Sequence, residues 1–153
     1  MKTLFLSLLV VFGASNAIFG QVAISDNGAK ISFTKEVHDY GTIKNGADRF
    51  CTFEFKNTGN APLIISDAKG SCGCTVPTWP KEPIGPGEKG TIKVEYDTKR
   101  AGAINKSVTI TSNAINDGYD AVTKLNTKII RIKGNVLPAP EDGTPVNNAG
   151  PSN

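Results

Sequence analysis

The sequence predicts an all-β protein, an antiparallel β-sandwich of about seven strands. Apolar residues recur at every second position in most segments, and clusters of turn residues separate these segments. No segment keeps apolar residues at helical spacing. The nearest helical candidate, residues 112–125, gives a broken match that Gly118 weakens further.

Four strand candidates lie in the N-terminal half. The clearest is in residues 47–60, where Cys51, Phe53 and Phe55 alternate with polar residues, as in a half-buried strand. Its last four residues, Asn-Thr-Gly-Asn, are turn formers that end the strand. The other candidates are residues 29–37, 38–46 and 61–66.

The C-terminal half supplies the remaining strands. Residues 90–98 place Ile92, Val94 and Tyr96 on one face. The same alternation continues in residues 106–112, and residues 127–136 close the predicted domain. Together with the first four candidates, these segments predict one folded unit over residues 22–136.

The two ends of the chain predict an exported protein. Residues 1–20 combine a lysine, a short apolar run and small residues, which is the layout of a secretory signal peptide. The apolar run is too short for a membrane span, so we expect a periplasmic or extracellular protein that does not span the membrane. Residues 137–153 are rich in Pro, Gly and Asn, and their composition predicts a disordered tail.

The charge, the histidine content and the motifs of the sequence exclude several classes of function. The formal net charge is +3, and no dense basic patch is present, so we expect no nucleic-acid partner. His38 is the only histidine, and no G-x-S-x-G elbow, P-loop or dinucleotide fingerprint occurs. We therefore expect a protein that is not an enzyme.

The stretch SCGC, residues 71–74, leaves three interpretations of Cys72 and Cys74 open. They are structural cysteines, a redox pair, or two thiolate ligands for a soft ion such as Cu(I). In an extended strand their Cα atoms would be roughly 6.6 Å apart, so a disulfide between them requires the backbone to curl at Gly73. We expect no cofactor, with copper as the alternative.

Two further side chains bear on these interpretations. Cys51 shares a face with Phe53 and Phe55 and is expected to pack as a small apolar residue or to bond to Cys72 or Cys74. Trp79 lies among four prolines, a run that does not fit a central strand. It either caps the core or contacts a protein partner as an exposed aromatic.

Residues 31–136 resemble an exported bacterial domain family of unknown function that carries a CGCT signature. This family is similar to the Hydin-type immunoglobulin-like domains, which share an N-T-G-x-x-P-L-x-I pattern followed by P-G. The resemblance implies an immunoglobulin-like sandwich outside the cytoplasm and implies no catalytic residue. The matching positions are Gly41, Asn57, Gly59, Pro62, Cys72, Gly73, Cys74, Pro86 and Gly87.

The sequence thus predicts an exported, non-enzymatic immunoglobulin-like module of the envelope. We expect its partner to be a protein, bound at a strand edge or at the loops of one end of the sandwich. The alternative is a thiol module in which Cys72 and Cys74 bind copper or exchange disulfides.

Overall fold

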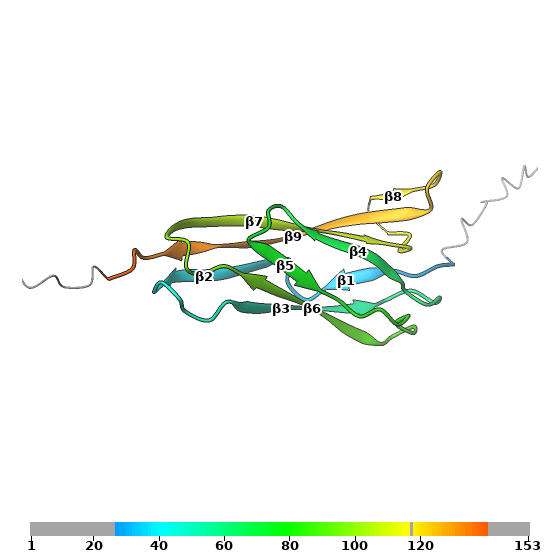
Figure 1. Ribbon diagram of the computed structural model, residues 1–153. Coiled ribbons are helices and arrows are strands. Elements are labelled where there is room, and N and C mark those ends of the chain that lie inside the picture. Colours follow the sequence, from blue (N-terminus) through cyan, green and yellow to red (C-terminus); the bar gives the residue numbers. More distant parts are fainter. Residues whose placement is uncertain (1–26, 117, 141–153) are drawn as a thin grey trace, which may run out of the picture.

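The computed structural model describes residues 27–116 and 118–140, which form two stacked β-sheets without a helix (Figure 1). The predicted signal peptide over residues 1–20 lies outside the described residues, as do residues 141–153 of the predicted tail. The strands are β1 (Ile31–Phe33), β2 (Val37–Ile43), β3 (Phe50–Asn57), β4 (Ile65–Gly70), β5 (Thr75–Thr78), β6 (Lys89–Tyr96), β7 (Gly102–Ser112), β8 (Tyr119–Asp120) and β9 (Leu125–Val136).

The two sheets confirm the predicted all-β sandwich. One sheet has the strand order β1-β3-β6-β5 and the other β2-β9-β7-β4, with the two-residue strand β8 paired to β9. Every pairing is antiparallel except that of β2 with β9, which is parallel. The chain leaves the first sheet after β1 and joins the second as β2.

The core lies between the inner faces of the central strands. In β3 the alternation seen in the sequence is realised, since Cys51, Phe53 and Phe55 are buried and the residues between them are exposed. Ile92 and Val94 of β6 lie opposite them in register. Burial of these side chains at about 25 cal/mol per Å² of apolar surface is the main force that stacks the sheets.

Asn57, at the end of β3, organises the turn that follows. Its side chain is fully buried, and its amide oxygen accepts hydrogen bonds from the backbone N–H groups of Lys30 (3.3 Å) and Gly59 (3.0 Å). Its amide nitrogen donates to the carbonyl oxygens of Ala61 (2.8 Å) and Ile84 (2.9 Å). The side chain thus uses both donors and both acceptor positions of its amide.

Strands β4 and β5 approach each other closely and join the two sheets along one side. A Cβ atom built on Gly70 would lie 1.9 Å from the carbonyl oxygen of Thr75. Only glycine fits such a contact with a backbone atom. Pro77 lies in β5, which is an edge strand, as expected for a residue that has no N–H to donate.

The described chain ends lie at opposite ends of the sandwich (Figure 1). Residues 137–140, the described part of the predicted tail, are exposed and contain no strand. Within the described ranges, no helix has the length and apolar character needed to cross a membrane.

Candidate functional site

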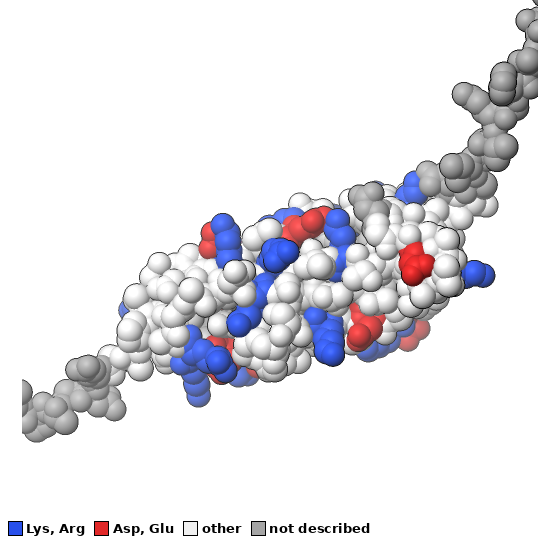
Figure 2. Space-filling model, turned by 90° about the horizontal axis from the view of Figure 1, so that it is seen from above, with Lys and Arg blue, Asp and Glu red and all other residues white. Residues whose placement is uncertain are grey.

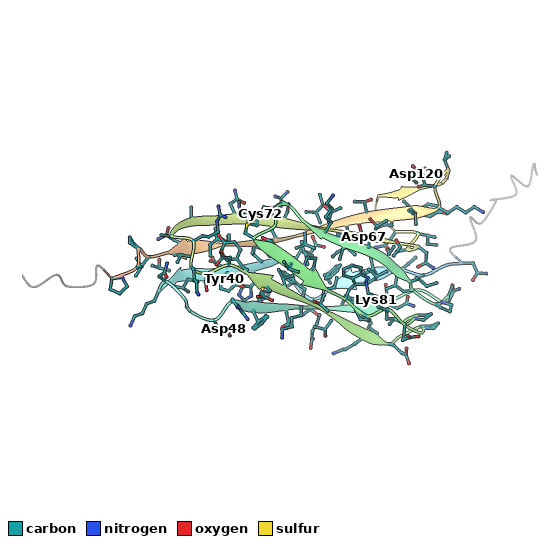
Figure 3. All side chains as sticks on the ribbon, viewed as in Figure 1. Tyr40, Asp48, Asp67, Cys72, Lys81 and Asp120 are labelled. Carbon is teal, nitrogen blue, oxygen red and sulfur yellow. A yellow bond between two sulfur atoms is a disulfide. The ribbon has the colours of Figure 1, made fainter. Side chains whose placement is uncertain are left out.

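Cys72 and Cys74 form a disulfide in the short loop between β4 and β5 (Figure 3). Their Cα atoms are 5.3 Å apart, closer than the separation expected of an extended strand. The loop curls at Gly73, whose Cβ position faces open space. The two cysteines are therefore held as a bonded pair, and the structural, redox and copper interpretations of their role stay predictions.

Backbone hydrogen bonds hold this loop on both sides of the disulfide. The N–H of Ser71 donates to the carbonyl oxygen of Ser107 on β7 (2.8 Å), and the N–H of Asp97 donates to that of Cys74 (3.0 Å). The N–H of Thr75 donates to the carbonyl oxygen of Cys72 across the turn (3.1 Å). The loop is thus anchored to both sheets independently of its sulfur atoms.

A pocket of about 550 Å³ adjoins Cys74. It is built from the loop between β2 and β3, the outer face of β3, β5 and β6, the first residues after β6, and the disulfide loop. Its lining residues are Gly46, Ala47, Asp48, Arg49, Phe50, Gly73, Cys74, Val76, Glu95, Asp97, Thr98 and Lys99.

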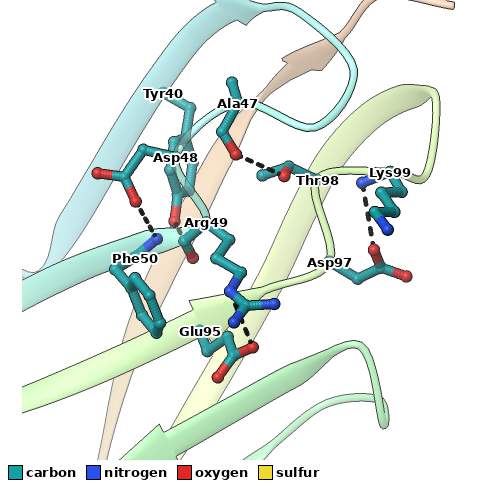
Figure 4. A network of polar contacts seen from close by, with 9 residues as sticks. All are labelled: Tyr40, Ala47, Asp48, Arg49, Phe50, Glu95, Asp97, Thr98 and Lys99. Atoms are coloured by element: carbon teal, nitrogen blue, oxygen red, sulfur yellow. Dashed lines mark hydrogen bonds and ion pairs between the residues drawn. The ribbon is translucent and has the colours of Figure 1, made fainter. Parts of the chain in front are cut away.

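Polar contacts hold the loops that form the pocket (Figure 4). Thr98 donates from its hydroxyl to the carbonyl oxygen of Ala47 (2.7 Å) and so ties two of these loops together. Arg49 Nε lies 3.2 Å from Glu95 Oε1 and links β6 to the residue before β3. This ion pair is exposed and contributes little to stability, but it positions both side chains at the pocket.

Two exposed apolar side chains lie in this pocket. Phe50 of β3 and Val76 of β5 both pair with Glu95 of β6, so they lie in one row across the sheet. They are 38% and 53% exposed. Lys93 Nζ lies 3.9 Å from the centroid of the Phe50 ring, within the range of a cation–π contact.

A second cavity, of about 460 Å³, adjoins Cys72. Gly73 and Val76 line both cavities, whereas Cys72 lines only this one and Cys74 only the larger one. Each sulfur-bearing residue is partly exposed. Both cavities therefore adjoin the disulfide loop, and Cys74 also packs against the core.

Cys51 is a free thiol buried in the core. This agrees with its predicted role as a small apolar packing residue and not with a bond to Cys72 or Cys74. Burial raises the pKa of this thiol, and the nearby Tyr40 only partly opposes that effect. A buried thiol of raised pKa is a poor nucleophile. Cys51 is therefore a packing residue and takes no part in the disulfide.

His38, the only histidine, packs against aromatic rings on β2 and β3. Its ring centroid lies 4.6 Å from that of Tyr40 and 6.4 Å from that of Phe53. Burial and then the positive charge of Lys35 lower the pKa of His38 below its ordinary value of 6.5, and Asp39 partly opposes them. No cysteine lies among these contacts, so His38 is separate from the disulfide.

We expect the free energy of unfolding to decrease as the pH falls through the range in which His38 titrates. The pKa of His38 is lower in the folded than in the unfolded chain, so the unfolded chain binds more protons there. The contribution of His38 to the free energy of unfolding is therefore fully present above its pKa in the unfolded chain. It is lost as the pH falls through its pKa in the folded chain. His38→Gln should flatten this part of the profile in urea unfolding at a series of pH values. Parallel profiles for the two proteins would contradict the prediction.

Trp79 lies directly after β5 and is partly buried against the core. Its indole Nε1 donates to the carbonyl oxygen of Ile65 (3.2 Å), so it covers the free edge of β4. Lys81 Nζ lies 3.2 Å from the centroid of the indole ring. In the isolated chain this side chain packs on the edge of the sandwich, and its predicted contact with a partner stays a prediction.

Two other predictions from the sequence concern a metal ion and a nucleic-acid partner. Within the described part of the chain, no group of three or more His, Cys, Asp and Glu side chains is arranged to hold a metal ion. Lysine and arginine side chains are interspersed with acidic ones on the face seen in Figure 2. That mixture is typical of a solvated protein surface.

Sequence reasoning identified the two cysteines of the site but missed Phe50, Val76 and Thr75. Phe50 and Val76 are the outward-facing members of alternating strands, and nothing in their local sequence distinguishes them from other exposed positions. Their common row depends on the pairing of both strands with β6. The pattern of one strand does not contain that information.

Comparison with solved structures shows the immunoglobulin-like, PapD-like fold. A protein of unknown function from Porphyromonas gingivalis W83 is 14% identical, with a TM-score of 0.59 over 74% of this chain and 50% of that one. The VesB protease of Vibrio cholerae is 12% identical, with a TM-score of 0.54 over 69% of this chain and 32% of that one. This chain thus spans half or less of both proteins.

The PapD-like domain 7 of human CEP192 is similar in size as well as in fold. It is 10% identical, with a TM-score of 0.56, and the match covers 90% of this chain and 99% of that domain. No curated protein matches the sequence. A family model described as "Protein of unknown function (DUF1573)" matches residues 31–136.

Proposed function

This chain belongs to the DUF1573 family of proteins of unknown function, and we propose that it is an exported, non-enzymatic module that binds a protein partner. The observation that carries the proposal is the pocket beside the disulfide, in which Phe50 and Val76 are exposed on either side of Glu95. Aromatic and aliphatic side chains in a pocket are the usual anchor sites of protein interfaces.

The pocket is suited to a segment of protein with an apolar anchor residue. Val76 and Phe50 provide apolar surface on either side of Glu95, and Asp48, Arg49 and Lys99 provide polar groups at its margin. Interfaces commonly combine an apolar centre with such a polar margin. Because backbone hydrogen bonds hold the surrounding loops, little ordering entropy is lost on binding.

The chemistry of the chain supports export as part of this proposal. The layout of residues 1–20 is that of a signal peptide. The Cys72–Cys74 disulfide suits an oxidising compartment such as the periplasm or the extracellular space. A binding module of the envelope agrees with both features.

Site-specific photo-crosslinking in cells tests this function. A photoreactive amino acid at Val76 should crosslink to a partner protein, whereas the same amino acid at Ile129 should not. Ile129 is a matched control, because it is a similarly exposed apolar residue at 45% and lies on the other sheet.

The identified partner is then measured against point variants in vitro. Val76→Glu should weaken its binding at least about tenfold, because a carboxylate would be buried against the anchor residue. Ile129→Glu should leave the affinity unchanged. Equal crosslinking from the two positions, or full binding by Val76→Glu, would exclude the pocket as the binding site.

A further inference from the structure

We infer that the Cys72–Cys74 disulfide is an exchange site, which oxidises a pair of cysteine thiols on a protein segment bound beside it. This inference goes beyond non-covalent binding at the pocket. It rests on what the disulfide connects, on access to its two sulfur atoms, and on the hydroxyl group next to them.

The disulfide contributes little as a structural link. It joins two residues of one turn, with a sequence separation of 2, and connects neither two strands nor the two sheets. In the chain-entropy account, the stabilisation by a disulfide decreases as the closed loop becomes shorter. The loop is also held by hydrogen bonds from Ser71, Thr75 and Asp97 that do not involve sulfur. Its shape should therefore survive reduction.

Access to the disulfide suits an attacking thiolate. Exchange requires the thiolate to approach one sulfur while the other sulfur leaves. Cys74 lines the cavity that contains Phe50, and Cys72 lines the second cavity, which shares Gly73 and Val76 with the first. A thiolate on a segment in the larger cavity would reach Cys74, and the Cys72 thiolate would leave toward the smaller one.

Thr75 is placed to stabilise the leaving thiolate. Its Oγ1 lies 3.7 Å from Cys72 Sγ and 3.8 Å from Cys74 Sγ. The residue is only 2% exposed, so water competes weakly for this hydroxyl. Hydrogen bonds to a charged group are stronger than those between neutral groups. The hydroxyl can donate to either sulfur once the disulfide opens.

The exchange balances as a two-electron transfer. A client thiolate attacks Cys74 Sγ, the Sγ–Sγ bond breaks, and a mixed disulfide forms as Cys72 leaves as a thiolate. The second client thiolate attacks the client sulfur of that mixed disulfide and releases Cys74. The client gains a disulfide, and Cys72 and Cys74 take up the two protons that the client thiols lost. A small disulfide such as oxidised glutathione restores the oxidised pair by the reverse steps.

The test uses the exported full chain and a short synthetic peptide that contains two cysteine thiols. Acid quenching, alkylation and intact-mass measurement follow the thiols of the protein and of the peptide over time. We expect the peptide to become oxidised as Cys72 and Cys74 become reduced, with an unchanged circular-dichroism spectrum. Cys51 is the internal control and should be alkylated only after unfolding. A pair that stays oxidised under excess peptide, or is reduced only as the chain unfolds, would overturn the inference.

Two valine variants on β5 test the role of the hydroxyl. Thr75→Val should slow the exchange about tenfold, and Thr78→Val should leave it unchanged, because Thr78 is exposed on the same strand and has no sulfur contact. Equal rates in the two variants would overturn the assignment of Thr75. Crosslinking of a partner at Val76 is measured independently of thiol exchange. A disulfide that does not react would therefore not contradict the proposed binding of a protein partner.

Discussion

Replacing Asn57 by alanine is expected to lower the free energy of unfolding by about 3 kcal/mol, although Asn57 touches no part of the pocket. The variant loses four hydrogen bonds of a fully buried amide. It also leaves the carbonyl oxygens of Ala61 and Ile84 without this donor. The cost of unpaired buried polar groups is larger than the net gain of an ordinary hydrogen bond.

The measurement is urea unfolding followed by circular dichroism, with Asn105→Ala as the control. Asn105 is exposed on β7, and its replacement should change stability by less than about 0.5 kcal/mol. If the two variants were equally stable, the buried amide would not organise the turn after β3. Because two of its four partners, Lys30 and Ile84, lie 27 residues away in the chain, the loss should extend beyond that turn.

Gly70→Ala is expected to destabilise the fold by about 2–3 kcal/mol. The new methyl group would meet the carbonyl oxygen of Thr75 at 1.9 Å, so β4 and β5 must separate. Backbone atoms on both strands resist this movement because each strand is paired to its own sheet. The separation would also displace Thr75 from the two sulfur atoms.

Gly73→Ala is the matched control in the same loop. Its Cβ would face open space and the residue has no positive φ, so the change should cost less than about 0.5 kcal/mol. Thermal and urea unfolding of the two variants compare these costs directly. A Gly70→Ala variant as stable as Gly73→Ala would show that β4 and β5 separate freely.

The sequence by itself determined the class of the fold and most of the central strands. The alternation in β3, β6, β7 and β9 was sufficient because a strand with one buried face must place its apolar residues at every second position. Turn residues such as those after Asn57 marked where strands end. The first predicted strand, residues 29–37, was wrong as a single element, because the chain changes sheets after β1.

For the site, the sequence indicated Cys72 and Cys74 but did not decide whether they are structural cysteines, a redox pair or thiolate ligands. Their pairing depends on the curl at Gly73, and the loop is held there by hydrogen bonds to Ser107 of β7 and from Asp97, which are far away in the chain. The pocket was decided by tertiary structure alone. Phe50 and Val76 lie in one row, on either side of Glu95, only because both pair with it. Such long-range register is set by packing of the whole sandwich rather than by any local pattern.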